Sequence, residues 1–221
     1  MNHWRRYLSE LFGTAALLCA VIGSGIMAEQ LADGNTAVAL LANTFATVFA
    51  LYVLIETLGP ISGAHFNPVV TGISYFRREL TFNLSMGYIV AQIIGAITGT
   101  IFANLIFNNS AIDISTKSRD GGNLLLSEFF ATAGLIFVIY QLSTIERSRF
   151  VSVGVASWIF AAYFFTSSTS FANPAIAIGR IFSNSFAGIA PHSALVFIPF
   201  EILGAACGYL LFTTLNQKAK K

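Results

Sequence analysis

Two Asn-Pro pairs are the residues of this chain best suited to a specific chemical task. They lie in Asn67-Pro68-Val69 and Asn173-Pro174-Ala175. Proline is favourable in the first turn of a helix, where its missing N–H is no loss, and asparagine directly before it is a good N-cap. Each pair therefore predicts the start of a short helix, the first running to about Tyr75 and the second to about Ile181.

The chemistry of such helix starts depends on how they meet. If the two segments enter a membrane from opposite faces, their positive N-terminal ends come together near the middle. Each asparagine can cap its own helix through its carbonyl oxygen and offer its NH₂ group to a passing oxygen. Two positive ends repel cations, and they force a central water to donate outwards in both directions, which interrupts proton conduction. The pattern favours uncharged solutes that carry hydroxyl groups, although a single Asn-Pro pair is equally well explained by a plain turn.

The composition points to a lipid environment. Of the 221 residues, 55% are hydrophobic and only 10% are charged, whereas soluble domains are about a quarter charged. The net charge of +2 gives no reason to expect nucleic acid as a partner. Cys19 and Cys207 stand alone in apolar runs, so we interpret them as small core residues and expect no metal or other cofactor. The apolar run that follows Arg5 and Arg6 has no cleavage-site pattern and is interpreted as a retained first span.

Apolar runs long enough to cross a bilayer, about 20 residues each, divide the chain. They predict six spanning helices, at 11–28, 36–55, 80–112 (centred on 86–106), 129–145, the first part of 150–179, and 194–215. Two further uncharged segments, 57–76 and about 166–179, contain the Asn-Pro pairs and are too polar and short to span. We interpret them as re-entrant segments, because irregular backbone at membrane depth persists only where protein or a water-filled cavity satisfies it.

Basic residues indicate the orientation. With six spans, nine of the twelve fall on one side: Arg5, Arg6, Arg77, Arg78, Arg147, Arg149, Lys218, Lys220 and Lys221. The loops of the other side contain only Lys117 and Arg119. Cytoplasmic loops carry the excess of lysine and arginine, so both termini are expected in the cytoplasm.

An internal repeat divides the chain into two halves, about 1–110 and 120–221, of a single channel domain, 1–221. The sequence at 9–15 returns at 127–133, that at 91–96 returns at 200–205, and the Asn-Pro pairs occupy matching places between them. Because each half has three spans, the second half must lie upside down relative to the first. Inverted repeats place the working site near the midplane, on broken helices.

The segment 61–71, Ile-Ser-Gly-Ala-His-Phe-Asn-Pro-Val-Val-Thr, resembles the first pore loop of the major intrinsic protein (aquaporin) family, with Val69 in place of the usual alanine. The segment 88–96 resembles the family's third span, and Asn173-Pro174-Ala175 resembles its second loop. The resemblance covers essentially the whole chain. It implies an all-α membrane fold of six transmembrane helices plus two re-entrant half-helices, a pore in each subunit and a homotetramer.

The resemblance also implies roles for ionisable residues inside the spans. Glu10 and Glu128 would brace the pore loops by accepting backbone N–H bonds, and an acid within a span is costly enough to suggest such a role. His65, in the first loop motif, is either a structural histidine that bonds the loop backbone, which we favour, or a pH-sensitive gate. The sequence assigns no role to Glu56 or Glu201.

The constriction departs from the family pattern. An arginine normally follows the second Asn-Pro-Ala, but here the residue is Ile176. Counting without gaps from the two asparagines places the other constriction positions at Thr47, Ala161 and Ser170. Such a filter is wider and less polar than that of water-selective members. It resembles arginine-less bacterial members, some of them associated with arsenite, so we expect glycerol-like polyols and neutral metalloid hydroxides as solutes besides water.

Arg180 offers an alternative. It lies four residues after Ile176, so on the same helix face, about 6 Å further along. Because helical side chains lean towards the N-terminus of their helix, Arg180 could replace the missing guanidinium and give a strict water channel. We favour the other reading, in which it lies in the outer vestibule and screens cations.

Two rival functions remain open. An ion-coupled secondary transporter would also have inverted repeats and could use Glu10, Glu128 and Glu201 as coupling acids. A closed membrane protein is the second rival, with its pore filled by Phe66, Phe164, Phe165 and Phe171. No catalytic constellation of Cys/His, Ser/His or paired acids stands out, so no enzyme is expected. The expected partners are water, small neutral solutes and the lipid bilayer, with the bacterial inner membrane as the location.

Overall fold

The computed structural model describes residues 3–144 and 148–216, and within these ranges the chain forms helices and loops only. In chain order the helices are α1 (His3–Leu31), α2 (Thr36–Ser62), α3 (Pro68–Phe76), α4 (Phe82–Ile106), α5 (Gly122–Thr144), η1 (Ser148–Phe150), α6 (Val151–Phe165), α7 (Pro174–Gly179), η2 (Arg180–Phe182) and α8 (Pro191–Leu215).

Six of these helices are long and apolar enough to cross a membrane, which confirms the predicted all-α membrane fold with six spans. The six are α1, α2, α4, α5, α6 with its preceding turn η1, and α8. Several are longer than predicted, because charged residues lie within the helices and do not end them. Glu10 lies inside α1 and Glu128 inside α5, where bonds to loops replace water, so the acids do not end their helices. Residue 145, the predicted end of the fourth span, lies outside the described residues.

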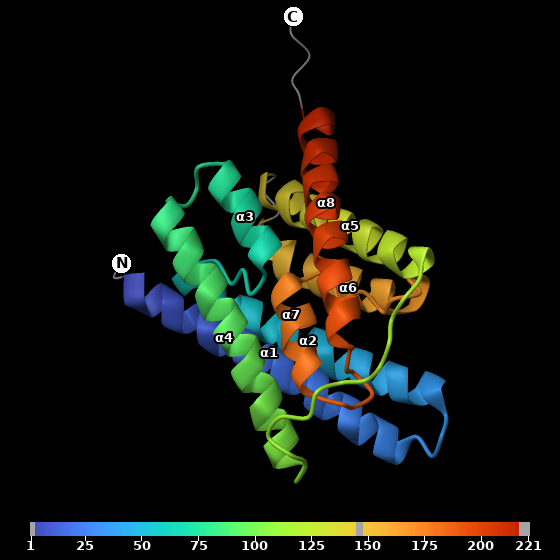
Figure 1. The fold of residues 1–221 in the computed structure, drawn as a ribbon. Coiled ribbons are helices and arrows are strands. Elements are labelled where there is room, and N and C mark those ends of the chain that lie inside the picture. Colours follow the sequence, from blue (N-terminus) through green and yellow to red (C-terminus); the bar gives the residue numbers. More distant parts are fainter. Residues whose placement is uncertain (1–2, 145–147, 217–221) are drawn as a thin grey trace, which may run out of the picture.

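The short helices α3 and α7 lie inside the bundle, where Figure 1 shows them between the long helices. The Oδ1 atom of Asn67 accepts the N–H of Val69 at 3.0 Å, and that of Asn173 accepts the N–H of Ala175 at 3.0 Å. Both are the N-caps that the Asn-Pro pairs predict. The two helices therefore begin at the asparagines and point away from the middle of the molecule.

Two pairs of long helices frame the short ones: α1 packs along α4, and α5 packs along α8 (Figure 1). Glycines allow the close approach. A Cβ atom on Gly99 of α4 would overlap the carbonyl oxygen of Ala15, and one on Gly208 of α8 would overlap that of Ala133. These contacts are typical of small residues at helix crossings in membranes.

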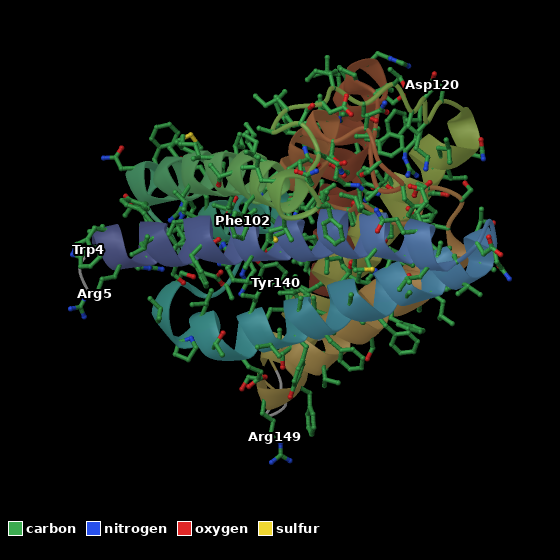
Figure 2. The ribbon with its side chains drawn as sticks, turned by 90° about the horizontal axis from the view of Figure 1, so that it is seen from below. Trp4, Arg5, Phe102, Asp120, Tyr140 and Arg149 are labelled. Carbon is green, nitrogen blue, oxygen red and sulfur yellow. The ribbon has the colours of Figure 1, made fainter. Side chains whose placement is uncertain are left out.

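The outer surface is largely apolar, with large hydrophobic side chains exposed on every spanning helix. Charged side chains gather at its ends. Figure 2 shows Arg5 at the left and Arg149 at the bottom of the view, both away from Asp120 at the upper right. Four basic residues of the predicted cytoplasmic set lie outside the described residues: Arg147, Lys218, Lys220 and Lys221. At the same edge as Arg149, Glu56 of α2 accepts a hydrogen bond from Ser152 of α6, which joins these two helices.

Candidate functional site

The two loops that precede α3 and α7 are bonded to each other by their asparagines. The Nδ2 atom of Asn67 donates to the carbonyl oxygen of Ala172 at 2.8 Å, and that of Asn173 donates to the carbonyl oxygen of Phe66 at 2.8 Å. An amide NH₂ has two hydrogens, so each asparagine keeps one for another acceptor. Both asparagines also line the central cavity, so this second donor is available to a solute.

The backbone of both loops is strained in the same pattern. Phe66 and Ala172, directly before the asparagines, have φ angles of 49°. Ala64 and Ser170, three residues before them, have φ angles of 50° and 52°. A side chain in this left-handed region costs energy and persists only where the surroundings fix it. The loops therefore need strong external bonds.

Glu10 supplies such bonds to the first loop. Its side chain is fully buried and accepts the backbone N–H of His65 at 3.0 Å and that of Phe66 at 2.7 Å. Ser62 Oγ donates to the same carboxylate at 2.6 Å, and Gln92 Nε2 donates at 2.8 Å. Four donors thus surround one buried charge, which is what a carboxylate requires in a water-free interior.

Two acids hold the second loop. Glu128 accepts the backbone N–H of Phe171 at 3.0 Å and that of Ala172 at 2.7 Å. Glu201, to which the sequence assigned no role, accepts the backbone N–H of Asn173 at 2.9 Å through Oε1. Its other oxygen, Oε2, is buried and has no hydrogen-bond partner among the described residues.

His65 bonds a side chain of the half-helix. Its Nδ1 atom lies 3.1 Å from the hydroxyl of Thr71, and its ring packs edge-on against Tyr88, with the centroids 5.5 Å apart. We expected the side chain of His65 to bond the loop backbone, but in the structure it bonds the hydroxyl of Thr71. The histidine joins the loop to the first turn of α3 and lines the cavity.

A cavity of about 350 Å³ runs past the two asparagines. Three of the four positions assigned to the filter line it, namely Thr47, Ser170 and Ile176. The hydroxyls of Thr47 and Ser170 are buried and have no partner within the described protein. The wall of the cavity therefore contains two hydroxyls whose hydrogen-bonding capacity the described protein leaves unused.

The assignment of Ala161, the fourth position, to the filter has to be corrected. It is exposed, and it is not among the residues that line the cavity. Helix α6 presents a stripe at four-residue spacing instead: Val151, Val155, Ile159 and Tyr163. Counting back from Asn173 without gaps assumes that α6 enters the loop in the family's usual register. In this structure α6 ends at Phe165, an irregular stretch leads to Asn173, and Tyr163 rather than Ala161 lines the cavity.

Arg180 lies where two cavities meet. Only 2% of it is exposed, and it lines both the central cavity and an outer one of about 280 Å³. Its Nε atom donates to the carbonyl oxygen of Ala187, and its guanidinium stacks 3.5 Å from the centroid of the Phe171 ring. Arg180 is therefore part of the cavity wall, one turn outside Ile176.

A second arginine, which the sequence placed only as a loop charge, reaches the same aromatic ring. Arg119 lies 5.1 Å from the Phe171 centroid and lines the outer cavity. It donates to the carbonyl oxygens of Gly188 at 3.1 Å and Ser168 at 3.3 Å. No spacing rule could have located it, because the segment that holds it is an irregular chain between α4 and α5.

Lys117 adds a third positive group to the outer cavity. Its Nζ atom donates to the carbonyl oxygen of Phe186 at 2.7 Å. Partial burial, with the nearby charges of Arg119 and Arg180, lowers the pKa of Lys117 to about 8. The outer cavity is thus positive at neutral pH and becomes less so above pH 8.

Comparisons with known proteins agree with this geometry. The family model described as "Major intrinsic protein" matches residues 1–165. The chain is 45% identical over 216 residues to "Aquaglyceroporin AqpS" of Rhizobium meliloti, covering 98% of this chain and 92% of that protein. It is 28% identical over 177 residues to "Nodulin-26" of Glycine max, covering 77% of this chain and 64% of that protein. The solved structure of the aquaglyceroporin from Plasmodium falciparum has the same fold, with a TM-score of 0.67 at 18% identity, covering 99% of this chain and 97% of that one.

Proposed function

Because this chain belongs to the major intrinsic protein family, whose members are channels for water and small solutes, we propose that it is a passive channel with a wide filter. Its solutes are glycerol-like polyols and neutral metalloid hydroxides such as arsenite in its neutral form, besides water. The protein is an integral membrane protein.

The observation that carries the proposal is the pair of free hydroxyls at the constriction. Thr47 and Ser170 line the cavity together with the apolar Ile176, and their buried hydroxyls have no partner within the described protein. A polyol or a metalloid hydroxide that enters gives up hydrogen bonds to water, and these hydroxyls replace part of what it loses. The apolar side accepts the carbon or arsenic part of the solute, as in other pockets that combine apolar walls with a few placed polar groups.

Exclusion of ions is proposed to come from the midplane and from the outer mouth. The N-termini of α3 and α7, capped by Asn67 and Asn173, face the cavity and repel cations and protons. Arg180 adds a positive charge one turn further out. Its contact with Phe171 and its bond to Ala187 support a vestibule role rather than a strict water filter, which remains the alternative.

The rival function, an ion-coupled transporter, would have to use acids that already hold the loops, including Glu201, whose Oε1 accepts the N–H of Asn173. The carboxylates of Glu10 and Glu128 are already bonded to backbone N–H groups of the loops. A coupling ion would have to displace these bonds, whereas a channel needs the loops to stay fixed. The occupied acids therefore favour the channel.

The arrangement in the cell is also proposed. Halves 1–110 and 120–221 are taken as inverted repeats, which the matching strain at Phe66 and Ala172 supports. A homotetramer is proposed from family membership. The side away from Asp120, with Arg5 and Arg149, is placed in the cytoplasm, with both termini there and the protein in a bacterial inner membrane.

Stopped-flow light scattering on proteoliposomes tests the proposal by comparing entry of water, glycerol and neutral arsenite. We expect the wild type to admit all three. Thr47→Val and Ser170→Ala should each lower glycerol entry by about two- to tenfold, as expected for the loss of one net hydrogen bond. Thr98→Val is the matched control, because this exposed threonine bonds only its own helix.

A second variant tests the width of the filter. Ile176→Arg should restore a narrow, charged constriction and lower glycerol entry at least about tenfold while water still passes. Ile176→Leu keeps an apolar side chain of the same volume and should change little. Fast water entry without any solute entry in the wild type would overturn the wide filter and favour Arg180 as its narrowing residue.

A further inference from the structure

Two buried carboxyl groups, those of Glu128 and Glu201, hold neighbouring residues of the second loop. Glu128 and Glu201 accept the backbone N–H groups of the consecutive residues Ala172 and Asn173, and both side chains are fully buried. Glu128 already accepts two backbone N–H bonds, and Oε1 of Glu201 accepts a third. Oε2 of Glu201 has no donor near it among the described residues. Burial and a neighbouring like charge both disfavour the ionised form of a carboxyl group, so this pair favours a proton on one of its members.

The matching place in the first half shows where that proton belongs. Gln92 occupies the position that Glu201 takes in the repeated segments 91–96 and 200–205. There Gln92 Nε2 donates a hydrogen bond to Glu10, the acid that braces the first loop, at 2.8 Å. A carboxyl group can make the same bond only if it is protonated.

We propose that Glu201 is protonated on Oε2 and donates a hydrogen bond from this oxygen to Glu128. Glu201 thereby acts as the positioning residue for Asn173. One carboxyl group then makes two directed bonds. Oε2–H donates to the bracing acid, and Oε1 accepts the N–H of Asn173 at 2.9 Å. This fixes the backbone of the asparagine whose amide crosses to the other loop.

The surrounding charges support this placement of the proton. Arg119 from the outer loop and Arg180 from η2 attract the negative charge of Glu128, with Tyr163 of α6 close to both arginines. The charge that acts on Glu201 is that of Glu128, and no arginine of the described chain offsets it. Glu128 therefore keeps the charge, and Glu201 keeps the proton.

Loss of the proton would set two carboxylates against each other at the base of the loop. Their repulsion would release Asn173 from Oε1, and the bond between Asn173 and Phe66 would weaken with it. We expect solute entry to fall at alkaline pH for this reason. The inference rests on the proposed channel function for this flux readout only.

Infrared spectroscopy of the purified protein in detergent tests the protonation directly. At neutral pH the wild type should show the carbonyl stretch of one buried carboxylic acid, which shifts on deuteration, and Glu201→Gln should lack it. Gln92→Glu is the mirror variant: it places two acids together in the first half and should add a second such band. A wild-type spectrum without the band, or a band that persists in Glu201→Gln, would overturn the proposal.

Flux in proteoliposomes tests the positioning role. Glu201→Gln should keep wild-type entry at neutral pH and lose the alkaline decline, because the amide donates at every pH. Glu201→Ala should lower entry about ten- to a hundredfold, since the Asn173 N–H loses its acceptor. If Glu201→Gln is as defective as Glu201→Ala, or keeps the alkaline decline, the positioning role is wrong. If the infrared band is present but no variant shows flux, the channel function fails and the proton assignment stands.

Discussion

The pore asparagine Asn173 makes three bonds that fix its position. For Asn173, Oδ1 caps α7, Nδ2 bonds the carbonyl oxygen of Phe66, and the backbone N–H bonds Glu201. The orientation of the amide is therefore fixed, and the hydrogen that remains for solute points in one direction. Asparagine is required because no other small side chain combines an acceptor for the cap with two donors.

Asn173→Asp should accordingly destabilise the protein. The aspartate has no donor for the carbonyl oxygen of Phe66, and it brings a charge next to that oxygen. We expect a loss of about 1–3 kcal/mol or more in the free energy of unfolding. Thermal unfolding in detergent measures it, with Asn216→Asp as the control, because Asn216 is exposed at the end of α8. Equal unfolding temperatures for the two variants would contradict the expectation.

Lys117 gives a prediction of pH dependence. Its pKa of about 8 lies below the usual 10.5, so the unfolded chain binds more protons than the folded one between these values. Stability should therefore rise as pH increases from about 8 to 10.5. The ammonium is partly solvated, so the gain should be at most about 1 kcal/mol. Unfolding temperatures of the wild type and Lys117→Met across this range test it, and parallel curves for the two proteins would show that Lys117 does not titrate there.

At the level of elements, the sequence of α6 contains the pattern of its cavity-lining face, but counting residues back from Asn173 did not find it. Its lining residues Val155, Ile159 and Tyr163 repeat at the four-residue spacing of one helix face, which the sequence displays. Choosing Ala161 by distance from Asn173 ignored that spacing. The register is set by the irregular loop after Phe165, whose path depends on Glu128 and Ser127, residues of another helix.

The segment between α4 and α5 could not be predicted in the same way. It has no regular structure and no counterpart that the repeat would supply, yet it brings Arg119 to Phe171. Its path is fixed by bonds to residues far along the chain, such as that of the Ser115 N–H to the carbonyl oxygen of Ile181 at 2.8 Å. The Asn-Pro helices were predictable because their signals are local.

The helix crossings give a prediction for packing. Gly99→Val and Gly208→Val each force a side chain into the carbonyl oxygen of a neighbouring helix. We expect each to cost about 1–3 kcal/mol or more, and to lower the yield of folded protein. Gly59→Ala is the control, since a Cβ there meets no neighbouring atom. Size-exclusion chromatography and thermal unfolding in detergent compare them, and a Gly99→Val protein as stable as the control would mean that α1 and α4 can separate without cost.

For the whole molecule, the orientation can be tested by labelling. In a background with Cys19→Ser and Cys207→Ser, a cysteine at exposed Asn109 should react with a membrane-impermeant maleimide applied to intact spheroplasts. One at Arg149 should react only after lysis. The reverse pattern would place the side that carries Arg5 and Arg149 outside the cell.

The crossed bonds of the two asparagines have a consequence for synthesis. Asn67 emerges from the ribosome long before Ala172, whose carbonyl oxygen it needs, and the first loop cannot reach its final geometry until then. The last helix, α8, supplies Glu201, so the second loop must wait for the end of translation. The spans can insert one after another, but the pore has to assemble afterwards, in a single step within the bilayer. During that interval each loop exposes unpaired polar backbone, which makes the half-made protein a substrate for insertion chaperones and quality-control proteases.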